Sequence, residues 1–232
     1  MLSLNYSFQT KVERAYIITI KNNATSERYS LECQKSCRDV GMDYVVWEAF
    51  DGHNNPIKIP AHLEHESFFK ALKVMDHYKT RTEIASALSH ISLWLECAKL
   101  DRPIVVLEHD AVMIKKFEEM KSFNSVVYLG CHEWKEGWPI YPIPPHNGDG
   151  NNYRFVFRLH AYAIDPAIAK NLLAYCLKYG ILGAADYFMR VDLFNISHQG
   201  FYAYDNMPNY EGTTIVNRRL FDNRKRNDNF IY

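Results

Sequence analysis

Two carboxylates follow an apolar, strand-like segment in the middle of the chain. Residues 104–107 read Ile-Val-Val-Leu, and Glu108, His109 and Asp110 come directly after them. In extended geometry Glu108 and Asp110 point to the same side of a strand, because side chains alternate between its two faces. The two carboxylates repel each other unless a cation lies between them. Mg²⁺ or Mn²⁺ suits oxygen ligands and keeps positions open for phosphate oxygens, so the stretch has the form of a diphosphate-binding metal site.

The acidic pair also fits a plainer interpretation, in which a polar strand end is followed by a turn. An acid-x-acid pattern alone does not separate the two interpretations. The position of the strand in the fold bears on the choice, because ligands of open α/β sheets bind outside the carboxyl ends of parallel strands.

Strand-like and helix-like segments alternate along the chain, which predicts an α/β fold with a mostly parallel central sheet flanked by helices. Apolar, β-branched runs predict strands over 15–20, 43–50, the segment opened by Pro103, 125–130 and part of 153–164. End signals and apolar periodicity predict helices from Thr25 or Ser26 to about Val40, across 60–79, from Thr80 onward, and from Asp165-Pro166 to near Gly180. No repeat or linker divides the chain, so residues 1–232 are expected to form a single domain.

The helix before the acidic pair has a clear start and two distinct faces. Thr80 and Glu83 form a capping box, in which each side chain satisfies the other's backbone donor. The residues of the buried stripe follow at spacings of four, three and four, and they are Ile84, Leu88, Ile91 and Leu95. Glu83, Ser86 and His90 lie on one flank beside that stripe. A histidine in such a place is more often a structural hydrogen bonder than a catalytic group.

The helix and strand together resemble the signature of glycosyltransferase family 25, found in lipopolysaccharide-synthesising transferases and procollagen galactosyltransferases. Family members carry sequences like E-I-G-C-A-L-S-H and I-L-E-D-D, and this chain has EIASALSH and VLEHD. Further blocks resemble the family in order and spacing over roughly 14–190, and they are AYIITIKNNATSERYSL, WEAFDG, HAYAIDPAIAKNLL and AADYFM. The chain departs from the family at His109, where a middle acid is usual, and at Ser86, where Cys is frequent.

The resemblance implies a GT-A-like fold, a metal ion (Mn²⁺ or Mg²⁺) and a nucleotide-sugar donor, expected to be a UDP-sugar. It implies that Asp110 holds the metal, with Glu108 directly or through water. His198 and His160 are candidates to complete the metal shell, because imidazole is an acceptable ligand for Mn²⁺, and the alternative is that each has a structural role. The residues expected to contact the donor are Arg28, Asp51, Glu83, Ser86 and His90. Asp186 is the candidate for an acceptor-side carboxylate that acts as base or orients the attacking hydroxyl, and the alternative is that it caps a following helix.

The overall charge and the start of the chain bear on partners and compartment. Twenty-seven basic and twenty-seven acidic residues cancel, so the whole molecule has no general attraction for nucleic acid or membranes. The first residues lack a signal peptide, no apolar run reaches membrane-spanning length, and five scattered cysteines suit reduced thiols. A cytoplasmic location is therefore expected.

Two segments bear on the acceptor. The aromatic segment 131–152, with Trp134, Trp138 and Tyr141, suits a lid or sugar platform. The C-terminal tail at about 217–232 is basic, and its cations are Arg218, Arg219, Arg224, Lys225 and Arg226. That tail is either a solvated charge run or a contact for a phosphate-rich acceptor, which is DNA with a hydroxymethylated base, as in phage DNA modification, or a glycan.

Two rival functions share these sequence features. One is a non-catalytic nucleotide- or glycan-binding member of the same fold, in which the replacement of the usual acid by His109 has abolished catalysis. The other is a nucleotidyltransferase-like enzyme, which also uses paired acids and a metal ion.

Overall fold

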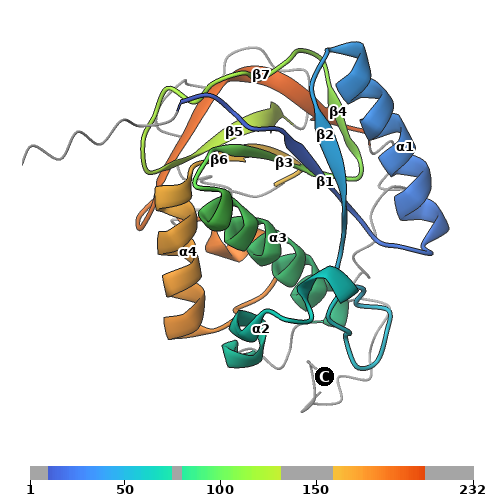
Figure 1. The fold of residues 1–232 in the computed structure, drawn as a ribbon, viewed down its shortest axis with the longest axis vertical. Coiled ribbons are helices and arrows are strands. Elements are labelled where there is room, and N and C mark those ends of the chain that lie inside the picture. The colour runs from blue at the N-terminus through green and yellow to red at the C-terminus, as the bar shows by residue number, and fades with distance from the viewer. Residues whose placement is uncertain (1–9, 75–79, 132–158, 207–232) are drawn as a thin grey trace, which may run out of the picture.

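The computed structural model describes residues 10–74, 80–131 and 159–206. Their strands form one seven-stranded sheet in the order β2-β1-β3-β6-β5-β7-β4 (Figure 1). The strands are β1 (Ala15–Thr19), β2 (Tyr44–Glu48), β3 (Ile104–Glu108), β4 (Ala111–Met113), β5 (Ser125–Cys131), β6 (Ala161–Ile164) and β7 (Asn195–Asp205). The helices are α1 (Ala24–Asp39), α2 (Ser67–Ala71), α3 (Arg81–Leu100) and α4 (Pro166–Tyr179), with the short 3-10 helices η1 (Ala61–Leu63) and η2 (Ala185–Phe188).

The sheet is mixed, whereas the sequence predicted a mostly parallel one. β1 pairs in parallel with β2 and β3, and β5 pairs in parallel with β7. β6 is antiparallel to both β3 and β5, and β4 is antiparallel to β7. The parallel pairs made by β1 lie in the half of the sheet in which strands alternate with α1 and α3. The other pairings join strands that are distant in sequence, and local residue patterns do not specify such partners.

Helices cover both faces of the sheet, which explains why its central strands are apolar throughout. On β1, Tyr16 and Ile18 pack into the core that contains α3 and α4, while Ala15 and Ile17 pack into the core beside α1. Figure 1 shows α1 on one side of the sheet and α3 with α4 on the other. A strand buried on both faces has an unbroken apolar sequence rather than an alternating one.

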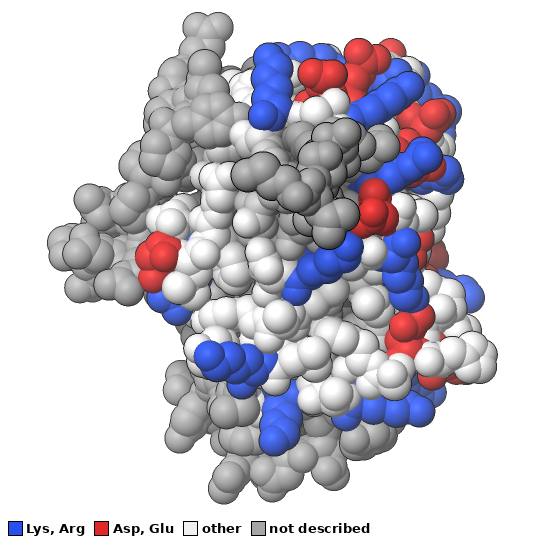
Figure 2. Space-filling view, turned by 60° about the vertical axis from the view of Figure 1, so that its left-hand side comes forward, with Lys and Arg blue, Asp and Glu red and all other residues white. Residues whose placement is uncertain are grey.

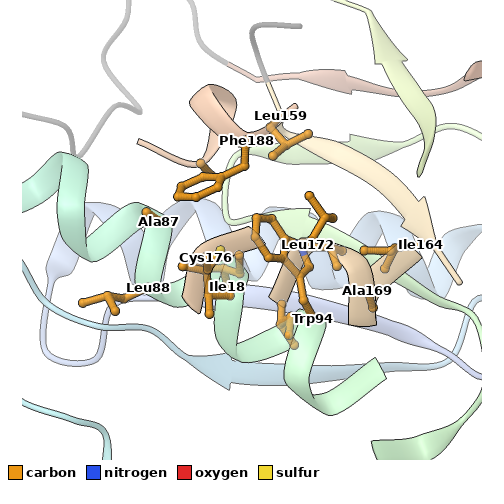
Figure 3. Close-up of a cluster of buried hydrophobic side chains, with 14 of the residues drawn as sticks. Ile18, Ala87, Leu88, Trp94, Leu159, Ile164, Ala169, Leu172, Cys176 and Phe188 are labelled. Atoms are coloured by element: carbon orange, nitrogen blue, oxygen red, sulfur yellow. The ribbon is translucent and has the colours of Figure 1, made fainter. Parts of the chain in front are cut away.

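The larger core holds α3 in place over the sheet. Trp94 of α3, Leu172 of α4 and Phe188 of η2 lie in this cluster (Figure 3). Trp94 and Phe188 meet edge to face with their ring centroids 5.7 Å apart. The predicted stripe of α3 is confirmed at Ile84, Leu88 and Ile91, which are fully buried, whereas Leu95 is partly buried and packs against the same core.

The start of α1 differs from the predicted one. Asn23 is the N-cap, and its side chain accepts a hydrogen bond from the backbone N–H of Ser26 at 3.0 Å. The Ser26 hydroxyl instead accepts from the backbone N–H of Ile20 at 2.9 Å, which ties the helix to the end of β1. The end was predicted correctly, since Val40 is the C-cap and Gly41 follows with a φ of 70°.

The other predicted helices had mixed outcomes. Residues 60–79 do not form one helix, because η1 and α2 occupy 61–63 and 67–71 separately, and 75–79 lie outside the described residues. The N-terminal signal of α4 is confirmed, because the Asp165 carboxylate accepts from the backbone N–H groups of Ala167 and Ile168. Gly180 is the C-cap of this helix.

The N-terminus of α3 is fixed by its own cap and by the loop after β2. The predicted capping box is present, with Thr80 Oγ1 and the Glu83 carboxylate each accepting from the other's backbone N–H. Gly52 lies directly against this turn, since a Cβ added to Gly52 would stand 2.5 Å from Thr82 Cα. The Asp51-Gly52 turn and the start of α3 are thus one packed unit.

Three sequence predictions fall partly or wholly outside the described residues. The aromatic segment with Trp134, Trp138 and Tyr141, the first part of 153–164, and the basic tail at about 217–232 belong there. Within the described part of the chain, none of the helices has the length and apolar character needed to cross a membrane.

Candidate active site

Glu108 lies at the carboxyl end of β3 and is held by a chain of buried side chains. Glu108 Oε1 is 3.1 Å from His90 Nε2, and His90 Nδ1 is 3.0 Å from the Tyr162 hydroxyl. The Trp94 indole N–H donates to the same hydroxyl at 2.8 Å. His90, Trp94 and Tyr162 are at most 1% exposed, whereas the Glu108 side chain is 31% exposed. This series of hydrogen bonds therefore extends from the core between α3 and the sheet to a carboxylate that is accessible to solvent.

Imidazoles set the electrostatics around Glu108. Burial is the largest single effect on Glu108 and opposes its ionisation, but the hydrogen bond with His90 and the nearby imidazoles together outweigh burial and hold the pKa of Glu108 below its usual value. The rings of His109 and His160 lie close enough to act in the same direction. Glu108 is thus an ionised carboxylate in neutral solution, and its described neighbours that favour its charge are histidines.

Asp110 is in the opposite electrostatic situation. It is 4% exposed, and its Oδ1 is buried without a hydrogen-bond partner among the described residues. Burial is the main cause that raises the pKa of Asp110 to about 8, followed by the charges of Glu108 and Asp205. A buried carboxylate among other carboxylates is costly to ionise unless a cation compensates it.

The two acids do not continue one extended strand, as the sequence-based argument assumed. β3 ends at Glu108, residues 109–110 form a turn, and β4 begins at Ala111. Glu108 faces α3 through His90, and Asp110 lies close enough to Cys33 of α1 to raise its pKa, after the larger effects of Cys37 and burial. The two carboxylates still interact, since Glu108 raises the pKa of Asp110. They therefore approach one another across a turn at the sheet edge.

The donor atoms at this turn fit a hard cation in type. Carboxylate oxygens are what Mg²⁺ and Mn²⁺ bind, and the buried Oδ1 of Asp110 accepts no hydrogen bond within the described part of the chain. Across residues 10–74, 80–131 and 159–206, no three His, Cys, Asp or Glu side chains are grouped so that they alone hold a metal ion. A magnesium-type ion is commonly held by one or two carboxylates, with phosphate oxygens and water completing its shell.

His198 and His160 lie around Gly130 on β5. His198 is on β7 opposite Tyr128, and its Nδ1 accepts from the backbone N–H of Gly200 at 3.3 Å. Burial, with a smaller effect of Lys115, holds the pKa of His198 below its usual value despite a hydrogen bond with Gly130. The His160 ring packs against Gly130, since a Cβ there would stand 2.0 Å from His160 Nε2. The backbone N–H of Glu108 donates to the carbonyl of His160, and the His160 ring is close enough to lower the pKa of Glu108.

Asp186 lies in η2, on the face of the sheet that carries α3. Its backbone carbonyl accepts from the N–H of Met189, and the N-cap of η2 is Ala184, so Asp186 lies within this 3-10 helix rather than at its N-cap. The pKa of Tyr128 is raised by burial and then by the charges of Asp186 and Glu108. Asp186 and Glu108 are therefore both close to Tyr128, which places the acceptor-side candidate near the acidic turn.

Arg28 and Asp51 flank this edge of the sheet. The exposed Arg28 guanidinium lies 4.7 Å from the centre of the Tyr29 ring, and that ring is 6.5 Å from His109. Asp51 has both carboxylate oxygens engaged in its own turn, where it accepts from the backbone N–H of His53 at 2.8 Å and from the Asn54 side chain at 2.9 Å. Asp51 therefore has a structural role in that turn.

Glu83 and Ser86 are closer to the start of α3 than His90. Glu83 is buried and caps the helix, and Ser86 is partly exposed one turn later. His90 is the member of this predicted flank that touches Glu108. The flank thus contributes a helix cap, a polar surface position and a buried hydrogen-bond partner, rather than one contiguous binding surface.

Sequence reasoning missed three residues at this edge. Tyr162 and Trp94 complete the chain to Glu108, and Asp205 contributes the third carboxylate near Asp110. The four-residue spacing of His90 and Trp94 was a usable signal, because it places both side chains on one face of α3. The contribution of Asp205 depends on the pairing of β4 with β7, where Ala111 lies opposite Asp205, and no local pattern shows that pairing.

Comparison with known proteins identifies the family of the chain. A search of curated proteins gave no match. The profile of glycosyltransferase family 25 (LPS biosynthesis protein) matches residues 12–136, which is more than half of the chain and includes β1, α3 and the acidic turn. With EIASALSH on α3 and VLEHD at the end of β3, this chain belongs to glycosyltransferase family 25.

Proposed function

We propose that the chain transfers a sugar from a nucleoside diphosphate donor, expected to be UDP, at the carboxyl ends of β1, β2 and β3 with the help of Mg²⁺ or Mn²⁺. The observation that carries this proposal is Asp110, a buried carboxylate with an unpartnered Oδ1 among the described residues and a pKa raised to about 8 by burial and by neighbouring acids. Such a group is unfavourable in isolation, and a bound cation removes the penalty.

The residues of this edge have separate roles in the proposal. Glu108 and Asp110 hold the cation, and the donor's diphosphate and water complete its shell. The bound cation supplies positive charge against the negative charge that builds up on the departing diphosphate. Arg28, exposed near the N-terminus of α1, is assigned to the phosphates, because a guanidinium pairs well with phosphate oxygens.

Asp186 is the acceptor-side group. Its charge and that of Glu108 both raise the pKa of Tyr128, which supports a position for Asp186 close to the proposed donor site. We assign Asp186 to orient the attacking hydroxyl and to accept its proton as the bond to the sugar forms. The leaving diphosphate keeps the electron pair of the broken glycosidic bond.

The acceptor is proposed to be a glycan hydroxyl. The family description names lipopolysaccharide biosynthesis. On the face drawn in Figure 2, basic and acidic side chains are interspersed rather than gathered into a basic surface. Duplex DNA binding depends on clustered cations, and binding that is lost on adding salt is its usual sign. A gel shift with hydroxymethylcytosine DNA at low salt tests the alternative acceptor, and a salt-sensitive complex would favour DNA over a glycan.

Donor screening tests the proposed reaction and separates it from its rivals. The protein is incubated with a panel of UDP-sugars, with Mn²⁺ or with a chelator, and UDP release is followed. We expect slow, metal-dependent release from one donor, and its loss in Asp110→Asn and Glu108→Gln. Glu13→Gln, the same type of change at the other end of the sheet, serves as the control. Binding without turnover under every donor and metal would favour the non-catalytic interpretation, and pyrophosphate release from a nucleoside triphosphate would favour a nucleotidyltransferase.

A further inference from the structure

The chain of hydrogen bonds that ends at Glu108 restricts where its hydrogen atoms lie. An indole N–H can only donate, so the Tyr162 oxygen accepts from Trp94 at 2.8 Å. The Tyr162 hydroxyl hydrogen is then available to His90 Nδ1, which is 3.0 Å away. When Nδ1 accepts, a neutral imidazole carries its hydrogen on Nε2, and Nε2 donates to Glu108 Oε1 at 3.1 Å.

The other neutral tautomer fits this surrounding poorly. With the hydrogen on Nδ1, the lone pair of Nε2 would face the Glu108 carboxylate at 3.1 Å. The Tyr162 oxygen would then accept from both Trp94 and His90, and its own hydrogen would have no acceptor among the described residues. His90 is 1% exposed, and Trp94 and Tyr162 are fully buried, so solvent does not supply a substitute partner.

We propose that Trp94 and Tyr162 are positioning residues that fix His90 as the neutral tautomer with hydrogen on Nε2, so that His90 holds Oε1 of Glu108 and leaves Oε2 for the cation of the donor. Among the described residues, Oε2 of Glu108 accepts no hydrogen bond. The part of the inference that concerns the cation rests on the proposed function, and the part that concerns the tautomer does not. Partners of this kind commonly tune affinity by orienting the group that binds the metal.

A purely packing role for Tyr162 makes a different prediction. If the ring only fills the core, removal of its hydroxyl leaves His90 unaffected. Tyr16 on β1 offers the matched control, because it is buried in the same core cluster and makes no hydrogen bond through its hydroxyl within the described residues. Tyr162→Phe and Tyr16→Phe therefore each remove a phenolic oxygen from the same core. Only Tyr162→Phe also removes a hydrogen bond with His90.

The test is nitrogen-15 NMR of histidine-labelled full-length protein, at a pH above the ordinary pKa of histidine. The two-bond proton–nitrogen correlations of His90, identified by their absence in His90→Gln, report which ring nitrogen carries the hydrogen. We expect the Nε2–H pattern in the wild type, its retention in Tyr16→Phe, and its change to a tautomer mixture in Tyr162→Phe. A wild-type His90 with hydrogen on Nδ1, or an unchanged pattern in Tyr162→Phe, would overturn the inference. The wild-type spectrum alone decides the tautomer if Tyr162→Phe does not fold.

Mn²⁺ affinity, measured by electron paramagnetic resonance in the presence of UDP, tests the link to the cation. We expect about 10-fold weaker binding in Tyr162→Phe and His90→Ala, partial recovery in His90→Gln, whose amide also donates, and wild-type binding in Tyr16→Phe. Equal affinity in all variants would overturn the positioning role. Absence of Mn²⁺ binding in the wild type would overturn the proposed function and the cation part of the inference, while the NMR result would still decide the tautomer.

Discussion

The two ends of the parallel strands treat their charged residues in opposite ways. At the amino ends of β1 and β3, Glu13 lies 3.0 Å from Arg14 and 2.8 Å from Arg102. The hydrogen bonds from Arg14 and Arg102 hold the pKa of Glu13 below its usual value. A cavity of about 600 Å³ at this end is lined by charges of both signs, and the lining includes Lys11, Glu13, Arg14, Asp43, Arg102 and Lys116.

At the carboxyl ends, acids are buried or held by histidines. Glu108 contacts His90, and Asp110 is buried near Glu108 and Asp205, with its pKa raised to about 8 by burial first and then by those acids. Buried carboxylates with raised pKa values, close to other acids, are found mainly at functional sites of proteins. Charge compensation thus distinguishes the amino ends of these strands from the carboxyl ends, where we propose the active site.

Substitution of Asp110 should have the largest effect on activity. Asp110→Asn keeps the size of the side chain and removes the charge that holds the cation. We expect donor turnover to fall about 1,000-fold, which corresponds to about 4 kcal/mol of transition-state stabilisation. Glu13→Gln at the opposite edge should leave turnover within about 2-fold of wild type, and comparable losses from both substitutions would remove the distinction between the two edges. UDP release at saturating donor measures both.

The two edges should also differ in how pH affects stability without added metal. The pKa of Asp110 is about 8 in the folded protein, above its usual value of 3.8. The contribution of Asp110 to the free energy of unfolding is therefore fully present below about pH 4 and is lost as the pH rises through about 8. The pKa of Glu13 is lowered from its usual value of 4.5. The contribution of Glu13 to the free energy of unfolding is therefore fully present above about pH 4.5 and is lost as the pH falls through the lowered pKa.

We therefore expect metal-free Asp110→Asn to be more stable than wild type near pH 8, by on the order of 3 kcal/mol, and similar to wild type near pH 4. Urea unfolding at the two pH values measures the difference. A stability gain of equal size at both values would show that Asp110 does not titrate as its surroundings indicate.

Glycine substitutions compare backbone packing at the two edges. Gly52, after β2, lies against the start of α3, where an added Cβ would stand 2.5 Å from Thr82 Cα, so Gly52→Ala should cost roughly 2 kcal/mol through forced displacement of α3. Gly41 at the opposite edge has open space around it but a φ of 70°, so Gly41→Ala should cost about 1 kcal/mol through backbone strain alone. Chemical denaturation measures both. Gly52→Ala should also reduce turnover because α3 carries His90, and Gly41→Ala should not.

The smallest effect is expected at the surface ion pairs. Arg102→Gln removes the 2.8 Å contact with Glu13, and both side chains are partly or largely exposed. We expect a loss of at most about 1 kcal/mol in the free energy of unfolding, and less at high salt. A larger, salt-independent loss would mean that the amino edge depends on its charges as much as the carboxyl edge does.

Local chemistry made part of the fold predictable. The capping box of Thr80 and Glu83 and the Asp165 cap before Pro166 were identified correctly, because such signals involve residues within one helical turn. Predictions failed where a competing local partner was present. Ser26 was one of the two expected caps of α1, but its hydroxyl accepts from Ile20, and Asn23 takes the capping role.

Features set by distant segments were not predictable from the sequence. The antiparallel pairing of β6 with β3 brings Tyr162 beside Val106 and within reach of His90, and β4 pairs with β7 rather than extending β3. The metal-site interpretation treated Glu108 and Asp110 as two positions of one strand, whereas the plainer interpretation, a strand end followed by a turn, describes the backbone at 108–110 correctly. The acidic pair itself was identified from the sequence, and its electrostatic difference required the tertiary structure.

Calorimetric titration of Mn²⁺ into the UDP-saturated protein, in two buffers of different ionisation enthalpy near pH 7, shows whether Asp110 binds the cation. Asp110 holds a proton at that pH in the metal-free protein, since its pKa is raised to about 8. Binding of Mn²⁺ to the acidic turn should therefore release close to one proton, and both binding and release should be lost in Asp110→Asn and retained in Glu13→Gln. Equal Mn²⁺ affinity in wild type and Asp110→Asn, with no proton released, would contradict the account.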